Sequence, residues 1–305
     1  MPSVTVNNGI TLEYESFGNV GDPAILLVMG LGAQLLLWPD ALVEMLVAKG
    51  FRVVRFDNRD VGLSTKLDHL GSPSMPLTFM KFMMRIPLRA AYKIGDMARD
   101  TAGLIEALSL GRTHVVGASM GGMIGQNLAA TFPDMVVSLT SIMSTTGNRR
   151  LPQPTWRART ALLSRPPKPG NVEAGTRHLM HILRVIGSRT HPAEENYLRN
   201  FCERHVRRSF YPPGVARQLL AIAASDDRSA TIARIVAPTL VMHGIEDPLL
   251  PPACGVETAR VIREGGGSAT LEIVEGMGHD LPVPLLPRLA DSIAAHCKRS
   301  AAEAK

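Results

Sequence analysis

Cysteine is scarce in this chain of 305 residues, and its three copies stand far apart. Cys202, Cys254 and Cys297 are odd in number and form no C-x-x-C pair. This spacing excludes the paired-cysteine pattern of a metal or redox site. We therefore expect reduced, mostly structural thiols in a cytoplasmic protein.

The sequence also lacks a leader pattern and a long apolar run. Residues 1–8 contain neither the basic nor the apolar segment of a signal peptide. The longest apolar stretch, 24–38, is interrupted by Gly30, Gly32 and Gln34. It predicts a strand that runs through a loop into a helix, and it excludes a membrane span.

Charge is unbalanced toward the positive side, with a formal net charge of +6. Such a balance can indicate a nucleic acid or an acidic surface as the partner. The excess arginine lies mainly between Arg149 and Arg234, interleaved with apolar residues and without a nucleic-acid-binding motif. We interpret it as a solvated helical face. The nucleic-acid alternative predicts salt-dependent retention on DNA.

Strand and helix patterns alternate along most of the chain. Asn8-Gly9 between two alternating segments predicts an antiparallel hairpin at the edge of a sheet. Buried strands are expected at 24–29, 51–56, 113–118, 135–143, 239–243 and 269–274, and helices at 35–49, 96–110, 255–263 and 284–296. This order predicts an α/β protein with a mostly parallel central sheet and flanking helices.

The pattern changes between residues 145 and 228, where prolines separate helical segments and no strand period occurs. We expect a helical cap inserted into a core formed by residues 1–144 and 229–305. Within the first part, residues 66–93 form a candidate lid segment. The portion 77–92 is rich in methionine and basic residues, and three alternatives stay open for it: a lid helix over the pocket, a surface helix that touches lipid, or an extra core helix.

The most informative stretch is 113–122, where a β-branched run meets a G-x-S-x-G pentad and a helical pattern. Gly117 and Gly121 flank Ser119 at the positions where a strand doubles back sharply into a helix. This is the order of a nucleophile elbow. The alternative interpretation is a small-residue turn before a helix.

Further motifs accompany the pentad: Val28-Met29-Gly30-Leu31-Gly32, the loop Asp57 to Ser64, the run His243 to Pro248, and Gly276 to Asp280. Together they resemble the α/β-hydrolase superfamily, and most of all its branch of small esterases that includes aclacinomycin methylesterase. The resemblance implies an α/β-hydrolase fold with an inserted helical cap.

A serine hydroxyl needs a base to activate it, and the base needs an acid to orient it. In this superfamily the chain order is Ser, acid, His, which points to Ser119, Asp247 and His279. The acid and the histidine both follow strands, so all three should meet at the carboxyl edge of the sheet. Glu246 is an alternative acid, whereas we expect His243 and Asp280 to support the triad by hydrogen bonds.

An oxyanion intermediate requires two N–H donors. The resemblance assigns them to the backbone of Met120, directly after the nucleophile, and of Leu31, in the loop after strand 24–29. Many relatives have His-Gly where this chain has Met29-Gly30, but a backbone donor survives that change. We expect Trp38 to be structural packing.

The acidic and basic residues Asp57, Arg59 and Asp60 predict a loop-bracing ion pair rather than a metal or phosphate site, because the sequence shows no metal-ligand spacing. We expect no cofactor and no metal ion.

The function implied is a serine hydrolase that cleaves carboxylic esters of small to medium hydrophobic molecules through an acyl-enzyme. The alternatives are a lactonase, a carbon–carbon bond hydrolase, a perhydrolase, and an aminopeptidase with Glu194 or Glu195 holding the amine. A different class is a hydrolase-like ligand-binding receptor with little turnover. The expected partner is a small-molecule ester; the sequence leaves open whether the chain forms a homodimer.

Overall fold

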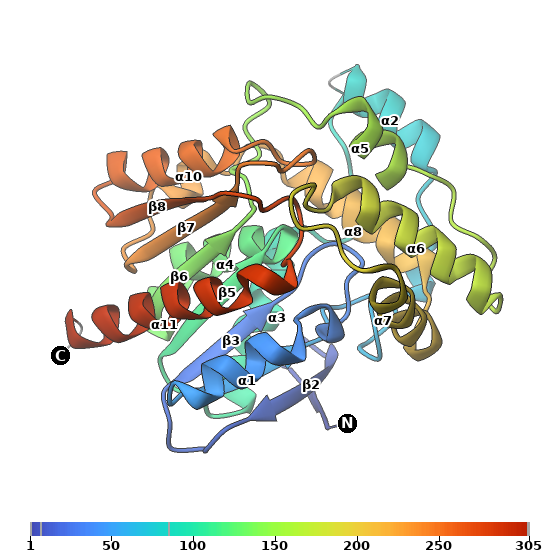
Figure 1. Cartoon of the computed structure of the whole chain (residues 1–305). Coiled ribbons are helices and arrows are strands. Elements are labelled where there is room, and N and C mark those ends of the chain that lie inside the picture. Colours follow the sequence, from blue (N-terminus) through green and yellow to red (C-terminus); the bar gives the residue numbers. More distant parts are fainter. Residues whose placement is uncertain (1, 7, 85, 304–305) are drawn as a thin grey trace.

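The computed structural model describes residues 2–6, 8–84 and 86–303, and within them eight strands form one sheet. The strand order is β1-β2-β4-β3-β5-β6-β7-β8 (Figure 1). The strands are β1 (Ser3–Thr5), β2 (Thr11–Phe17), β3 (Ala24–Val28), β4 (Arg52–Phe56), β5 (Thr113–Ala118), β6 (Val136–Ile142), β7 (Thr239–Gly244) and β8 (Ala269–Val274). The pairs from β4 to β8 are parallel, so their carboxyl ends share one edge.

The first two strands form the antiparallel edge that Asn8-Gly9 predicts. Val4 pairs with Leu12 in this hairpin, and Gly9 has a φ of 79°, a conformation that glycine adopts without strain. Tyr14 of β2 then pairs with Phe56 of β4, also antiparallel. The hairpin is thereby attached to the parallel part of the sheet.

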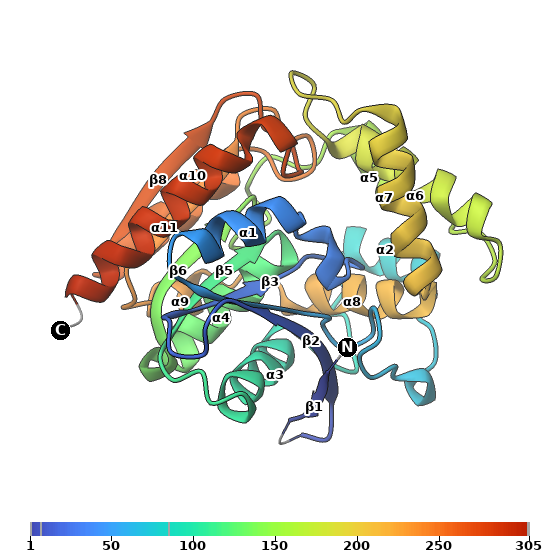
Figure 2. The same cartoon turned by 60° about the horizontal axis from the view of Figure 1, so that its bottom comes forward.

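Helices cover both faces of the sheet. Ile25 and Leu27 of β3 join the core beneath α1 (Asp40–Ala48) and α11 (Leu286–Glu303). Leu26 and Val28 join the core on the other face, beneath α3 (Ile94–Ala107), α4 (Met120–Thr131) and α10 (Ala253–Glu264). Figure 2 shows α1 and α11 together on one side of the sheet and α3 on the other. Because both faces are covered, β3 is apolar throughout rather than alternating.

Five helices and no strand lie between β6 and β7, four of them within residues 145–228, all of which the structure describes. They are α5 (Trp156–Leu162), α6 (Val172–Ile186), α7 (Glu195–Arg208), α8 (Pro212–Ser225) and α9 (Ser229–Ile232), the last just beyond the predicted boundary. Thr155 and Asn171 begin α5 and α6 as N-caps, each accepting a bond from a backbone N–H three residues on. Helices α5 to α8 lie beyond the carboxyl edge of the sheet (Figure 1). We call residues 145–228 the cap, and its standing as a separate domain stays a prediction.

Two predicted helices have different bounds in the structure. The helix expected at 35–49 is a short 3-10 turn, Leu35–Leu37, followed by α1 from Asp40. Pro39 causes the break, because proline forces the residue before it into an extended conformation, and Trp38 has a ψ of 114°. The final helix continues to Glu303, beyond the predicted end at His296.

Helix α2 (Met75–Met83) begins the segment 77–92 at the surface of the molecule, whereas Tyr92 at the end of the segment is buried. The helix packs against α8 and leaves Met80 and Met83 exposed by 50% and 59%. The core-helix alternative is therefore wrong. Methionine content alone could not separate these alternatives, because methionine fills cores and also covers binding surfaces. Among the described residues, no helix has the length and hydropathy that crossing a membrane requires.

Candidate active site

Ser119 occupies the sharp turn between β5 and α4. Its φ of 56° and ψ of −119° are strained for a residue with a side chain. Its N–H donates to the carbonyl of Ile142 at 2.9 Å, and its own carbonyl accepts from Ser144 Oγ at 2.9 Å. A Cβ at Gly117 would overlap the carbonyl oxygen of Gly121, and one at Gly121 would overlap that of Val28. The two glycines are therefore the residues that permit the strand and the helix to meet this closely.

His279 and Asp247 meet Ser119 at the carboxyl edge of the sheet. The Ser119 Oγ lies 2.9 Å from His279 Nε2, and His279 Nδ1 lies 2.7 Å from Asp247 Oδ2. The other carboxylate oxygen, Asp247 Oδ1, accepts from the N–H groups of Leu249 and Leu250, each at 2.8 Å. One line of hydrogen bonds thus joins the three residues that the sequence motifs single out.

The electrostatics of this line depend on the buried Asp247. Burial alone would raise the pKa of the Asp247 carboxyl, but the charge of His279 and hydrogen bonds from His243 and His279 outweigh burial and hold that pKa well below its usual range. An ionised carboxylate orients the His279 imidazole with its Nδ1–H toward Asp247. His279 Nε2 is then free to accept the Ser119 proton, which is what a serine nucleophile requires.

The residues beside the triad have separate partners. Glu246 accepts from the N–H groups of Arg189 and Thr190 at 2.7 and 3.1 Å, so the acid that contacts His279 is Asp247. His243 Nε2 lies 2.7 Å from the Leu250 carbonyl and 3.4 Å from Asp247 Oδ2.

Asp280, in contrast, does not bond to the triad. It accepts from the N–H of Ser188 in the cap at 3.1 Å, and from its hydroxyl as well. Burial raises the pKa of Asp280 despite these bonds from Ser188. The expected support of the triad is therefore present at His243, whereas Asp280 connects the histidine loop to the cap.

The loop after β3 lies against Ser119. A Cβ at Gly30 would lie 3.1 Å from the Ser119 Cβ, so this loop borders the space beside the hydroxyl. The N–H of Gly32 donates to Gln218 and that of Ala33 to Gly30, which leaves neither for an oxyanion and favours Leu31 as the donor. Met120 is the first residue of α4, where backbone N–H groups have no partner within the helix.

The cap holds this same loop. Gln218 of α8 accepts from the Gly32 N–H at 2.8 Å and donates through its amide nitrogen to the Arg59 carbonyl at 2.7 Å, while its side chain is fully buried. Gln34 donates to the carbonyls of His205 and Ser209 at the end of α7. Sequence reasoning missed both glutamines, because each contacts residues more than 150 positions away and neither belongs to a local motif.

In place of the one loop-bracing ion pair expected among Asp57, Arg59 and Asp60, each of the three pairs with a residue elsewhere in the chain, and two of the three partners come from the cap. Arg59 pairs with Asp100 of α3, with N–O distances of 2.5 Å. Asp57 pairs with Arg208 of α7 at 2.7 Å, and Asp60 pairs with Arg217 of α8 at 2.7 and 2.8 Å.

The prediction of a solvated arginine face holds for some arginines of the cap and fails for others. Arg177, Arg199 and Arg207 are exposed and paired with glutamates, as a solvated face requires. Arg208 and Arg217, in contrast, expose only 9% and 4% of their side chains. The prediction was wrong for these two, because a charged residue can be buried when a carboxylate across an interface pairs with it.

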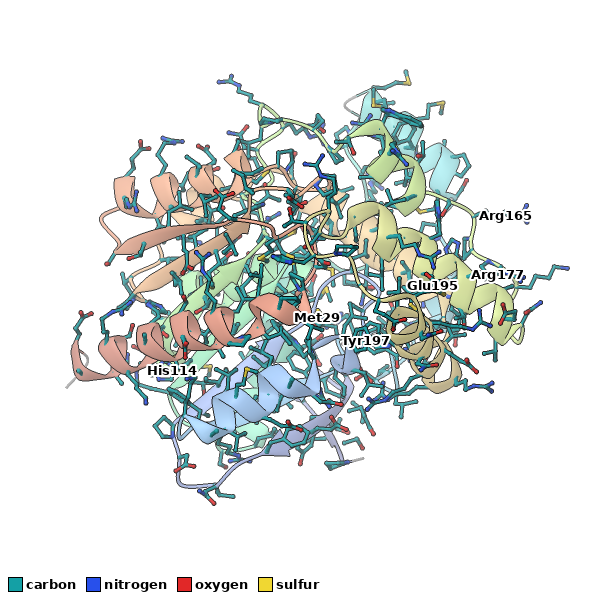
Figure 3. The ribbon with its side chains drawn as sticks, viewed as in Figure 1. Met29, His114, Arg165, Arg177, Glu195 and Tyr197 are labelled. Carbon is teal, nitrogen blue, oxygen red and sulfur yellow. The ribbon has the colours of Figure 1, made fainter. Side chains whose placement is uncertain are left out.

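A cavity of about 1690 Å³ opens beside the Ser119 side chain. Core residues such as Met29 and cap residues such as Tyr197 both line it, on facing elements (Figure 3). Most of the lining is apolar, for example Leu31, Met123, Leu179, Ile182, Leu183, Phe201 and Leu219. Helix α2 contributes Met75, Pro76 and Phe79. Such a cavity suits a ligand that is largely hydrophobic.

The sequence pattern of the family described as alpha/beta hydrolase fold matches residues 23–282. The chain belongs to this α/β-hydrolase family. It is similar to rhodomycin D methylesterase DauP of Streptomyces sp. (strain C5), with 27% identity over 95% of both chains, and to rhodomycin D methylesterase DnrP of Streptomyces peucetius, with 27% identity over 98% of this chain and 99% of DnrP. The recognised likeness to small methylesterases of this superfamily is thereby confirmed.

Solved structures show the same fold. The enol-lactonase from Burkholderia xenovorans LB400 superposes with a TM-score of 0.71 and 23% identity, covering 97% of this chain and all of that one. Its likeness concerns the architecture. Together with the eight-stranded sheet it confirms the predicted α/β-hydrolase fold.

Proposed function

We propose that this protein is a serine hydrolase that cleaves carboxylic esters of small to medium hydrophobic molecules. The observation that supports this most is the line of hydrogen bonds from Ser119 through His279 to Asp247 beside a large apolar cavity. The names of DauP and DnrP, both methylesterases, support an ester as the bond cleaved. No cofactor is needed for this chemistry.

In the proposed mechanism, Ser119 Oγ attacks the ester carbonyl while His279 Nε2 takes its proton. The N–H groups of Leu31 and Met120 hold the oxyanion of the tetrahedral intermediate. His279 then returns the proton to the leaving alcohol, which leaves an acyl group on Ser119. Water attacks this acyl-enzyme, with His279 again as the base, and releases the acid.

One rival loses support from the structure. An aminopeptidase would need a free carboxylate for the substrate amine, and Glu194 and Glu195 were the candidates in the sequence. Glu194 is the N-cap of α7 and accepts from the N–H groups of Asn196 and Tyr197, while Glu195 pairs with Arg184. A lactonase uses the same residues on a cyclic ester and is separated from an esterase only by substrate.

The test compares wild type with Ser119→Ala on p-nitrophenyl esters of increasing acyl length. We expect wild type to turn over, with kcat in the variant reduced by about 10⁴-fold or more. A serine-reactive fluorophosphonate should label wild type with one equivalent and leave the variant unlabelled, and circular dichroism should show the same fold in both. Undiminished turnover by Ser119→Ala would overturn the proposal. Labelling without turnover of any ester would favour the receptor alternative.

A further inference from the structure

We infer that the rim of the cavity formed by α2 and α5 docks on the surface of an anionic phospholipid membrane. The rim is defined as residues 75–89 without Arg85, together with residues 155–168. Both helices line the cavity, through Pro76 and Phe79 of α2 and Leu162 of α5. The two helices overlap in the view of Figure 1 and stand apart in Figure 2, so they form two separate parts of the border of the cavity.

Exposed apolar side chains gather on this rim. Of the seventeen large hydrophobic residues exposed in the described part of the chain, eight lie here: Leu77, Phe79, Met80, Met83, Met84, Ile86, Trp156 and Leu163. Trp156 exposes 74% of its surface, and Met84 exposes 63%. Single exposed hydrophobic residues are ordinary on a protein surface, but such a concentration marks an interaction site.

The rim also has a one-sided charge. The sequence contains no aspartate or glutamate between His69 and Gly95, and none between Met135 and Val172. On the rim itself Arg89, Arg157, Arg165 and Lys168 are exposed, and Arg165 points away from the body of the protein (Figure 3).

Three of the four acidic residues that border the two acid-free stretches are engaged by other side chains, and the fourth, Asp134, lies just before β6 and so at the opposite edge of the sheet from the cavity. Asp68 bonds to Tyr211, Asp96 pairs with Arg99, and Glu173 pairs with Arg177 and Arg199. Nothing in these stretches therefore neutralises the positive rim.

This combination matches an anionic lipid surface better than other partners. Basic groups that surround apolar and tryptophan side chains are the pattern of elements that lie in a membrane interface. A symmetric dimer through the rim would bring the two sets of basic groups against each other. A nucleic acid would contact the basic side chains of the rim but would leave its exposed apolar side chains in water. Docking would place the mouth of the cavity at the lipid, and this holds whether or not Ser119 is the nucleophile.

The chain contains its own fluorescent reporter of docking. Of its two tryptophans, Trp38 is fully buried and Trp156 is on the rim. The full-length protein is mixed with vesicles of phosphatidylglycerol and phosphatidylcholine, and separately with vesicles of phosphatidylcholine alone. We expect co-sedimentation with the anionic vesicles, at least about tenfold stronger than with neutral ones, and a blue shift of the tryptophan emission. Brominated lipid should quench that emission.

Two matched double variants test whether the rim is the surface that docks on the membrane. Met80→Glu with Met83→Glu changes two exposed rim residues that do not line the cavity. Val20→Glu with Val236→Glu makes the same charge change at residues exposed by 80% and 69%, which precede β3 and β7 and so lie at the opposite edge of the sheet. The rim variant should lose at least about tenfold in binding to anionic vesicles, whereas the control variant should lose about twofold or less.

Hydrolysis of a water-soluble p-nitrophenyl ester should be unchanged in both double variants, which separates docking from the proposed catalysis. Equal losses in the two variants would overturn the inference, because net charge alone would then explain them. So would equal binding of wild type to neutral and anionic vesicles. Self-association that the rim substitutions abolish would assign the rim to a second copy of the chain instead.

Discussion

The two loops that flank Ser119 are held in place by different parts of the molecule. The elbow, residues 117–121, is fixed by the core itself: Gly121 packs on the Val28 carbonyl, and the Ser119 N–H bonds to Ile142. The loop that carries Leu31 is fixed largely from the cap, through Gln218 and through the bonds of Gln34. The difference indicates that the cap positions the loop of the proposed oxyanion donor Leu31 and also lines the cavity.

Ion pairs between the cap and the core explain how the cap can position the loop that carries Leu31. Arg208 reaches from α7 to Asp57, whose other oxygen accepts from the Leu35 N–H just past the oxyanion loop. Arg217 reaches from α8 to Asp60. Burial alone would raise the pKa of Asp60, but hydrogen bonds from Arg217, Leu67 and Tyr92 lower it below its usual value. The Asp60 carboxylate is thus an ionised partner of Arg217, and the two ion pairs fasten α7 and α8 next to the loop.

The largest effect is expected at the elbow. In Gly121→Ala the added methyl group overlaps the Val28 carbonyl oxygen, a backbone atom that cannot move without disturbing β3. We expect the free energy of unfolding to fall by at least about 3 kcal/mol and the activity to be lost with it. Urea unfolding measures it. The control is Gly95→Ala in α3, where an added Cβ has no neighbour within 4 Å, and wild-type stability of Gly121→Ala would contradict the packing described.

The second largest effect is expected at Asp247. This residue acts through His279 and the elbow rather than through the loop that carries Leu31. Asp247→Asn places an amide N–H against His279 Nδ1 and favours the wrong tautomer, so kcat should fall by about 10⁴-fold. KM should change little, because Asp247 has no place in the cavity lining. Steady-state kinetics at neutral pH measure both constants. Retention of more than a tenth of kcat would mean that another acid orients His279.

The ionisation of Asp247 also makes the free energy of unfolding depend on pH. The folded-state pKa of Asp247 is lowered, so its carboxylate contributes stability that is fully present above the unfolded pKa of about 3.9. That contribution is lost as pH falls below this value toward the folded pKa. The difference in unfolding free energy between wild type and Asp247→Asn should therefore shrink as pH falls below about 4. A difference that shrinks near neutral pH would point to another group.

The sequence predicted the parts of the site that local motifs carry. The pentad around Ser119 and the post-strand positions of Asp247 and His279 are visible because each depends on neighbours in the chain. Gln218 and Arg208 are not visible, since a glutamine or an arginine on a cap helix looks like any solvated residue until the cap is folded onto the core. The break at Pro39 could have been predicted from the proline, but the helical spacing of 35–49 outweighed it.

An intermediate effect is expected when the contact between the cap and the oxyanion loop is removed. Gln218→Ala deletes both bonds of the buried amide, to the Gly32 N–H and the Arg59 carbonyl. The loop should lose its fixed position, and kcat should fall by about 10- to 100-fold, less than for loss of a whole donor. Little change in KM is expected, because ester binding rests on the apolar lining.

A merely structural role for Gln218 predicts a different result. It would lower stability and leave kcat of the folded fraction at the wild-type value. Gln218→Glu sharpens the distinction, since it retains an acceptor for Gly32 but loses the donor to Arg59. If the acceptor matters for the loop, this variant should keep more of kcat than Gln218→Ala does, whatever its stability. Affinity for a boronic acid, which mimics the tetrahedral intermediate, should follow the same order.

The smallest effect is expected where the two loops touch. A Cβ at Gly30 would lie 3.1 Å from the Ser119 Cβ and 3.3 Å from the Ala118 carbonyl, closer than ordinary contact but short of overlap. In Gly30→Ala the oxyanion loop should retreat by a few tenths of an ångström, so that Leu31 aims its N–H less well and kcat falls by about tenfold. Gly125→Ala is the matched control, because its Cβ would be equally tight, 3.0 Å from Leu139 Cδ1, but on the side of α4 that faces the sheet. If both variants lose kcat equally, crowding around α4 is the cause; a loss confined to Gly30→Ala assigns it to the loop that the cap holds.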